Sequence, residues 1–231
     1  MNIIALTTVH DLKITISKEN YLKTIAEAES EGEVVIAATL ARWLLITPPA
    51  VTAAVQRLKR DGLIRVGREG RIALTQPGRL IAERLLKRHH LIERMLTEIF
   101  GMEWFKVHDE AEQLEHGVSE DFEQRLVAVL GSGETCPHGN SSGADSPAIR
   151  RKRGWVPLHE VGAPGRFQLM SVYERDRQLL EFLDSLQLRP GVCFSWVGRN
   201  YDETLTLRIG EHQFQLGAPA AKRVWVARAA A

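Results

Sequence analysis

The sequence predicts a mainly α-helical chain with α+β parts, divided into three domains. Three observations support this: short helical patterns ending in a hairpin pattern over about 1–77, a strongly helical stretch over 78–130, and a strand-rich end over 150–231. Turn-forming residues fill Gly131–Pro147, which we expect to be an exposed linker. The predicted domains are therefore 1–77, 78–148 and 149–231.

Composition indicates a globular protein. Of its 231 residues, 44% are hydrophobic and 26% are charged, which is close to the average for folded domains. We find neither a membrane-spanning apolar run nor a signal peptide pattern in Met1–Val9, and two cysteines give no disulfide framework. We therefore expect a cytoplasmic protein with no membrane partner.

The first domain has the pattern of a winged helix-turn-helix. Ser17 is placed to cap a first helix, a second is expected over about 36–44, and Thr47-Pro48-Pro49 opens a third that stops at Gly62. Alternating apolar residues in Leu63–Leu74 predict a β-hairpin. In this arrangement the later of the two helices joined by the turn, here the one that Thr47-Pro48-Pro49 opens, enters the major groove of DNA.

Local charge agrees with DNA binding. From Arg42 to Arg71 there are seven basic and two acidic residues, a local charge of +5 in a chain whose net charge is +1. Phosphate contacts dominate affinity for DNA, so a basic stripe is the expected footprint. The alternative is the solvated basic face of a small α/β domain. The order of the elements and the prolines favour DNA binding.

The helical middle combines imidazoles with carboxylates. On a helix over about 79–100, His89 and Glu93 fall on the apolar stripe, whereas His90 is expected at the surface. A second helix, expected to run unbroken over 107–130, carries four such groups on one side: His108, Glu112, Glu115 and His116.

These groups suggest a metal site. Singly, each is more simply a solvated pair or a hydrogen-bonded core histidine, but six of them on two helices favour a shared cation. Oxygen and nitrogen donors suit Mn(II) or Fe(II), although Zn(II) and Cu(II) bind comparable ligands more tightly. An enzyme is not expected: Glu112 stands where the HxxEH zinc-protease motif needs histidine, and we find no phosphate loop, GxSxG elbow or Rossmann fingerprint. No organic cofactor is predicted.

Several motifs resemble those of one known family. They are Asn20-Tyr21-Leu22-Lys23, Pro49-Ala50-Val51-Thr52, Arg57-Leu58-Lys59-Arg60-Asp61-Gly62-Leu63, Leu74-Thr75-x-x-Gly78, Arg88-His89-x-Leu91-x-Glu93-Arg94 and Val107-His108-Asp109-Glu110-Ala111-Glu112-x-x-Glu115-His116. Together they resemble the manganese-responsive branch of the diphtheria-toxin-repressor family. The resemblance implies a metal-dependent repressor of metal-transport genes, a homodimer formed through the middle helices, a palindromic operator, and an FeoA-like β-barrel as the last domain.

The resemblance also implies a primary metal site. Its ligands here are Glu112, Glu115, His116 and a group from the first helix. Because the iron branch has cysteine at position 112, Glu112 favours Mn(II), with Fe(II) as the alternative ion. Asn20 stands where relatives have methionine or aspartate, and His10 or Asp11 is the alternative ligand. Lys23 replaces a glutamate of some manganese sensors.

A second site is implied by Cys136-Pro137-His138, which matches a segment of related manganese regulators. Glu93 and an acid from the last domain would join it, and we favour Asp176 over Glu174. His89 and His108 belong to an ancillary site in the iron branch. Two metal sites per subunit are therefore expected. The alternative for Cys136 is a free thiol in a flexible linker.

The resemblance assigns DNA contacts as well. We expect Arg57 and Arg60 to contact phosphates. Ala53 stands where some relatives have a base-reading glutamine, so specificity should depend more on the shape of the DNA. The groove-facing residues are Thr47, Pro49, Ala50 and Thr52. In the last domain we expect strands near 167–172, 192–197 and 204–209 and a helix over 176–185. The basic run Arg150–Arg153 is expected to be solvated, with contact to phosphate as the alternative. The rival functions are a metal-binding interaction protein with incidental DNA binding and a winged-helix sensor of an organic ligand.

Overall fold

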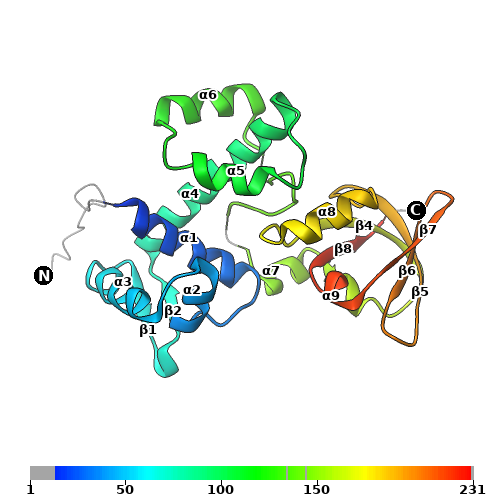
Figure 1. Cartoon of the computed structure of the whole chain (residues 1–231), viewed down its shortest axis with the longest axis horizontal. Helices are drawn as coiled ribbons and strands as arrows, with labels where there is room; N and C mark the ends of the chain where they lie inside the picture. The colour runs from blue at the N-terminus through cyan, green and yellow to red at the C-terminus, as the bar shows by residue number, and fades with distance from the viewer. Residues whose placement is uncertain (1–13, 134, 144, 230–231) are drawn as a thin grey trace, which may run out of the picture. The chain divides into compact units, whose positions relative to one another are not determined.

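A computed structural model describes residues 14–133, 135–143 and 145–229 of the chain (Figure 1). His10 and Asp11, the alternative first-helix ligands, lie outside the described residues. The chain forms two compact units, Met1–Leu86 and Lys87–Ala231. The three-domain division stays a prediction.

The first unit has the predicted order of elements. Three helices, α1 (Ile16–Ser30), α2 (Ala37–Leu44) and α3 (Pro48–Arg60), precede the antiparallel strands β1 (Ile64–Val66) and β2 (Ile72–Leu74). The hairpin tip is a 3-10 turn, Arg68–Gly70. The winged helix-turn-helix is thus confirmed. Its cap was misplaced: the Thr15 hydroxyl, and not that of Ser17, accepts from the Lys18 amide at 3.4 Å.

A close contact joins the hairpin to the following helix, α4 (Gln76–Arg94). The Thr75 hydroxyl donates to the Gly62 carbonyl at 2.7 Å and accepts from the Gly78 amide at 3.3 Å. A Cβ atom on Gly78 would lie only 2.0 Å from the Leu63 carbonyl oxygen. The Leu74-Thr75-x-x-Gly78 motif therefore fixes the start of α4 against the hairpin.

The second unit begins with the end of α4 and the helices that follow it. A π-helical turn, Met95–Ile99, extends α4, and α5 (Val107–Leu114) and α6 (Glu120–Leu130) follow. The prediction of one unbroken helix over 107–130 was wrong. The Gly117 amide closes a turn onto the Leu114 carbonyl at 2.9 Å, and the Ser119 hydroxyl caps a new helix by accepting from the Phe122 amide.

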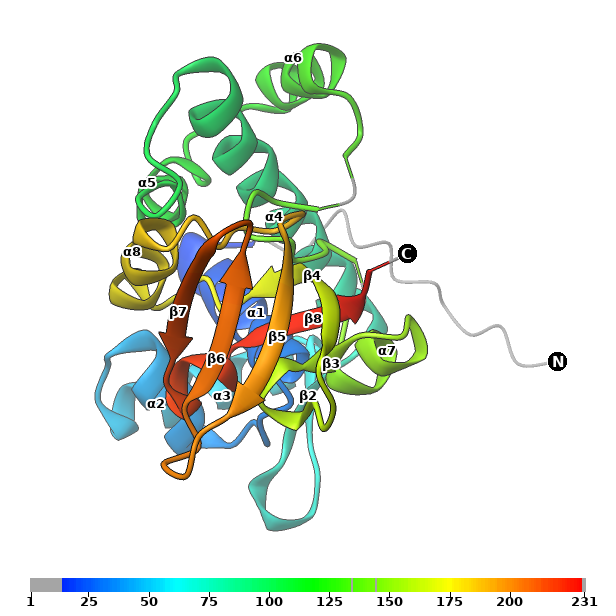
Figure 2. The ribbon, with the colours of Figure 1, turned by 90° about the vertical axis from the view of Figure 1, so that its right-hand side faces the viewer.

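An antiparallel six-stranded sheet with the strand order β3-β8-β4-β5-β6-β7 completes the second unit (Figure 2). Register shifts on β4 and β5 mark bulges, which bend a sheet locally. The predicted strands and helix of the last domain are confirmed. The elements are α7 (Pro147–Lys152), β3 (Val156–Pro157), a 3-10 turn (Leu158–Glu160), β4 (Gly165–Val172), α8 (Arg177–Ser185), β5 (Cys193–Arg199), β6 (Leu205–Ile209), β7 (His212–Leu216), α9 (Ala218–Ala221) and β8 (Val224–Arg228).

The basic run at the start of this region is not fully solvated, which corrects the prediction for Arg150. Its side chain is 1% exposed, and its Nε donates to Asp145 Oδ2 at 2.8 Å. The guanidinium also lies 5.2 Å from the centre of the Trp225 ring. A carboxylate partner and an aromatic face make this burial tolerable.

Within the described part of the chain, no single helix is long and apolar enough to cross a membrane. The pair α2 and α3, bent by 115°, reaches the required length and composition only when its two helices are combined.

We predict that Gly78→Ala destabilises the first unit. The added methyl group collides with the backbone at Leu63, and such overpacking costs about 1–3 kcal/mol. Urea unfolding followed by circular dichroism measures the change. Gly67→Ala is the matched control: its Cβ would meet nothing closer than 3.7 Å, so we expect a change within about 0.5 kcal/mol. Equal stability of the two variants would contradict the proposed contact.

Candidate metal centre

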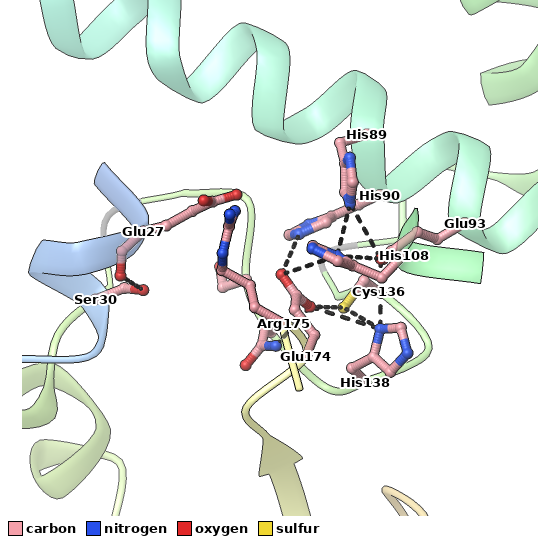
Figure 3. A network of polar contacts seen from close by, with 12 residues as sticks. Glu27, Ser30, His89, His90, Glu93, His108, Cys136, His138, Glu174 and Arg175 are labelled. Atoms are coloured by element: carbon pink, nitrogen blue, oxygen red, sulfur yellow. Dashed lines mark hydrogen bonds and ion pairs between the residues drawn. The ribbon is translucent and has the colours of Figure 1, made fainter. Parts of the chain in front are cut away.

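Seven side chains with metal-binding atoms gather inside the second unit (Figure 3). They come from α4, from α5, from the loop before α7 and from the residue pair after β4, and each is at most 9% exposed. The members of this buried centre are His89, His90, Glu93, His108, Cys136, His138 and Glu174.

The helices supply one side of the buried centre. His89 and Glu93 lie one turn apart on α4, and His89 Nε2 is 3.1 Å from Glu93 Oε1. His108 Nδ1 on α5 approaches the same Glu93 oxygen at 3.2 Å. On its other side, His89 Nδ1 contacts Glu115 Oε2 at 2.6 Å. The prediction that His89 and Glu93 face inward is therefore confirmed.

The loop Cys136–Asn140 supplies the opposite side, and it is not the exposed linker that its composition suggested. The His138 carbonyl accepts from the Val172 amide at 3.0 Å, and Asn140 Nδ2 donates to the Val172 carbonyl at 3.0 Å. Gly139 has φ +83°, and a Cβ there would lie 2.0 Å from the Met170 carbonyl oxygen. The glycine thus permits tight docking on β4, which buries Cys136 and His138.

Trp104 orients the imidazole of His138. The Trp104 carbonyl can only accept, so His138 Nε2 donates to it, over 3.1 Å. The Nδ1 atom therefore faces the buried centre, 3.4 Å from Glu93 Oε1 and 3.6 Å from Glu174 Oε2. A carbonyl that fixes the tautomer of a histidine in this way is a common outer partner of metal ligands.

The charges in the buried centre are strongly coupled. Burial opposes ionisation of Glu93, but His138 and His89 lower its pKa well below the ordinary value. Burial also opposes protonation of His138, yet Glu93 and Glu174 raise its pKa to about 10. Burial, together with Glu174 and Glu93, raises the pKa of the Cys136 thiol. Without a cation, the protonated imidazole of His138 offsets part of the charge of Glu93 and Glu174, and the thiol donates to Glu174 Oε2 at 3.2 Å.

The donors fit a divalent transition-metal ion. One group, His90, Glu93, Cys136 and Glu174, and a second, His89, Glu93 and His108, each offer atoms within 4.8 Å of one another. Among the described residues, the buried Glu93 Oε2 has no hydrogen-bond partner. A buried carboxylate oxygen in this state is costly unless a cation reaches it.

Two residues were misjudged from the sequence. His90 was expected at the surface but is 5% exposed, with Nε2 4.0 Å from Glu174 Oε1. Asp176 was preferred to Glu174, yet its carboxylate caps α8 by accepting from the Leu179 amide at 3.0 Å. Glu174, 9% exposed, occupies the place expected for Asp176. The sequence contained a signal for this role, because aspartate directly before a helix is a favoured N-cap.

The residues of the implied primary site are distributed differently. Glu115 is 2% exposed, and its Oε1 lies 3.6 Å from His116 Nε2. Glu112 is more exposed and forms an ion pair with Arg175. Asn20 lies on α1 in the first unit and is half-buried. Their roles as ligands stay predictions.

The predicted DNA-contacting residues are accessible. Every one of them is exposed, and Pro48 and Pro49 stand in the first turn of α3 as predicted. Thr47 precedes α3 without capping it through its hydroxyl, and the Thr52 hydroxyl donates to the Pro48 carbonyl at 3.1 Å. The exposed residues are Thr47, Pro49, Ala50, Thr52, Arg57 and Arg60, and their contacts with DNA stay predictions.

Comparison with known families assigns all three regions. Residues 13–70 match the iron dependent repressor N-terminal DNA binding domain, and residues 75–142 match its metal binding and dimerisation domain. Residues 156–228 match the FeoA domain. The chain contains the two domains of iron-dependent repressors. Proteins built from these domains are DNA-binding repressors and not enzymes, in agreement with the sequence prediction.

The curated relatives are named as repressors, and one of them is named for iron. The iron-dependent repressor IdeR of Mycobacterium tuberculosis (strain ATCC 25618 / H37Rv) is 43% identical over 122 residues, 53% of each chain. The diphtheria toxin repressor of Corynebacterium diphtheriae is 39% identical over 140 residues, 60% of this chain and 62% of that protein. This chain thus matches about half the length of the curated relatives.

Solved structures similar to most of the chain include manganese regulators. A manganese-dependent transcriptional repressor in complex with manganese has a TM-score of 0.81 and 26% identity, covering 92% of this chain and 100% of that one. The manganese regulator SloR has a TM-score of 0.74 and 28% identity, covering 94% and 100%.

We predict that cation binding at the buried centre releases protons. With a pKa of about 10, His138 is protonated at pH 7, and the raised pKa of Cys136 keeps its thiol neutral. Metal ligands bind deprotonated, so affinity should rise with pH between 6 and 8, by about tenfold per pH unit for each proton released. Calorimetry in buffers of different ionisation enthalpy counts the protons. Affinity that does not change with pH would contradict the assignment.

Proposed function

We propose that this chain is a Mn(II)-dependent DNA-binding transcriptional repressor of metal-transport genes. The observation that carries the proposal is the buried centre of carboxylates, imidazoles and one thiol in a chain that also has a winged helix-turn-helix. Relatives named as iron-dependent and manganese-dependent repressors support it. Such a protein acts where the DNA is, which we take to be the cytoplasm.

Two metal sites per subunit are proposed. The first takes Glu112, Glu115 and His116, with Asn20 as the candidate ligand from α1. The second is the buried centre, with Glu93, Cys136, His138 and Glu174 as ligands. Because Glu115 also contacts His89 at 2.6 Å, a ligand of the first site touches the buried centre directly. His89, His90 and His108 then orient or complete the second ligand set.

Mn(II) is proposed as the ion of the first site because Glu112 offers oxygen, and oxygen with imidazole suits Mn(II). Fe(II) is the second candidate, favoured by the relatives named for iron. The thiol of Cys136 gives the buried centre a softer donor that Mn(II) does not require.

A homodimer is proposed because apolar side chains remain exposed between the end of α4 and the end of α6. Large apolar side chains left exposed in this way are frequent at interfaces. The region lies within the match to the dimerisation domain. A twofold dimer would read a palindromic operator, one half-site per winged domain. The exposed residues are Ile99, Phe100, Leu114, Phe122 and Val129.

Repression by metal is proposed to work through linkage. A cation strengthens operator binding only as far as it favours the DNA-competent form of the dimer over other forms. In this mechanism the fold orients the carboxylates and imidazoles for the cation and places α3 for the major groove of DNA.

We predict metal-dependent operator binding. Fluorescence anisotropy with DNA from the protein's own promoter region should show binding tightened at least tenfold by Mn(II), about 1.4 kcal/mol of coupling. Scrambled DNA is the sequence control, and parallel titrations with Fe(II) and Zn(II) rank the ions. Equal affinity with and without metal would contradict the proposal.

The same assay tests the first site. Glu115→Ala and His116→Ala remove one donor each and should abolish the effect of Mn(II) while leaving the dimer intact by light scattering. Gln113→Ala is the matched control, since its exposed amide donates to the Asp109 carbonyl and has no contact with the proposed ligands among the described residues. Unchanged metal dependence in both donor variants would refute these ligands.

We predict that Cys136 binds the metal of the buried centre as a thiolate. Co(II) added to the protein should give the near-ultraviolet absorption of a thiolate–cobalt bond, because a cation lowers the pKa of a coordinating thiol. Cys136→Ser should remove this band. Cys193→Ser is the control, since Cys193 lies on β5. A band that survives in Cys136→Ser would exclude the thiol as a ligand.

A further inference from the structure

Two neighbouring residues after β4, Glu174 and Arg175, contact different groups. Glu174 enters the buried centre, whereas Arg175 points in another direction (Figure 3). Arg175 Nη1 lies 3.1 Å from Glu112 Oε1 on α5. The Arg175 side chain is 19% exposed and that of Glu112 is 41% exposed, so the pair is shielded only in part.

The Glu112 carboxylate has a second nitrogen neighbour. His108 Nε2 lies 3.7 Å from Glu112 Oε1, and Nδ1 of the same ring lies 3.2 Å from Glu93 Oε1. Both the guanidinium and the imidazole therefore face a single oxygen of Glu112. The guanidinium of arginine is always charged in proteins, so the attraction of Arg175 for Glu112 persists at every physiological pH.

We propose that Arg175 is a built-in competitor of the metal ion at Glu112. The inference rests on the proposed role of Glu112 as a ligand. In the metal-free protein the guanidinium neutralises the Glu112 carboxylate, so a cation that binds this carboxylate competes with Arg175 for it and is repelled by its charge. Arg175 thereby raises the free metal concentration at which the first site fills.

The size of this effect follows from the exposure of the pair. Ion pairs that water reaches contribute little, so removing this one should tighten metal binding about two- to fivefold. The competition weakens the binding of every divalent cation that uses Glu112. Arg175 therefore sets the threshold of the response and leaves the order of the metals unchanged.

The chain contains a matched control for this effect. Arg177, at the start of α8, lies 3.7 Å from Asp109 on α5, and these side chains are 47% and 53% exposed. This pair joins the same two segments as Arg175 and Glu112. Neither of its residues is proposed as a metal ligand, so removing it tests a general loosening of the segment.

Mn(II) titration of the full chain tests the proposal, with electron paramagnetic resonance reporting free Mn(II). The first site is the one that Glu112→Gln removes. Arg175→Gln should tighten that site two- to fivefold, Arg175→Lys should stay nearer to the wild type, and Arg177→Gln should leave the affinity unchanged. Circular dichroism checks that the variants fold alike.

Three results would overturn the proposal, and they are distinguishable. If Glu112→Gln removes a site but Arg175→Gln binds Mn(II) with equal or weaker affinity, Arg175 is no competitor and the ligand role of Glu112 stands. If Glu112→Gln removes no Mn(II) site at all, the first site of the proposed function falls together with this inference. Tightening in Arg177→Gln equal to that in Arg175→Gln would also refute a specific role for Arg175.

Discussion

A carboxylate removed from water requires positive charge beside it, and Glu93 imposes this requirement on the second unit. Its side chain is fully buried, and the imidazoles of His89, His108 and His138 approach one of its oxygens within 3.4 Å. The histidines come from three segments far apart in the sequence. Satisfying one buried charge therefore helps to bring α4, α5 and the Cys136–Asn140 loop together.

The surrounding backbone is built to hold these groups in place. Gly139 lets the loop dock on β4, the Trp104 carbonyl fixes the His138 ring, and Asn140 Nδ2 donates to Glu174 Oε2 at 2.6 Å. Because the carboxylates, imidazoles and thiol are already oriented, a cation would meet ligands that need little rearrangement. Metal binding must displace protons, because His138 and Cys136 bind a metal only in their deprotonated forms.

Local sequence predicted what local physics determines. The helix-turn-helix and hairpin follow from caps, prolines and alternation, and the 3.6-residue period alone places His89 and Glu93 inward. What failed depends on distant packing. His90 is buried beside Cys136 and Glu174, which come from other segments, so the periodicity of α4 cannot predict its burial. Arg150 is buried because it pairs with Asp145 and packs on Trp225. The polar composition of the Cys136–Asn140 loop concealed its docking on β4.

The central claim is that the buried centre around Glu93 holds a metal ion. Anomalous scattering at the manganese edge, from crystals of the full chain grown with Mn(II), tests it most directly. The account predicts an anomalous peak in contact with the Glu93 carboxylate, between His138 and Glu174. Well-ordered side chains at this position without such a peak, in crystals whose Mn(II) binds elsewhere, would contradict it.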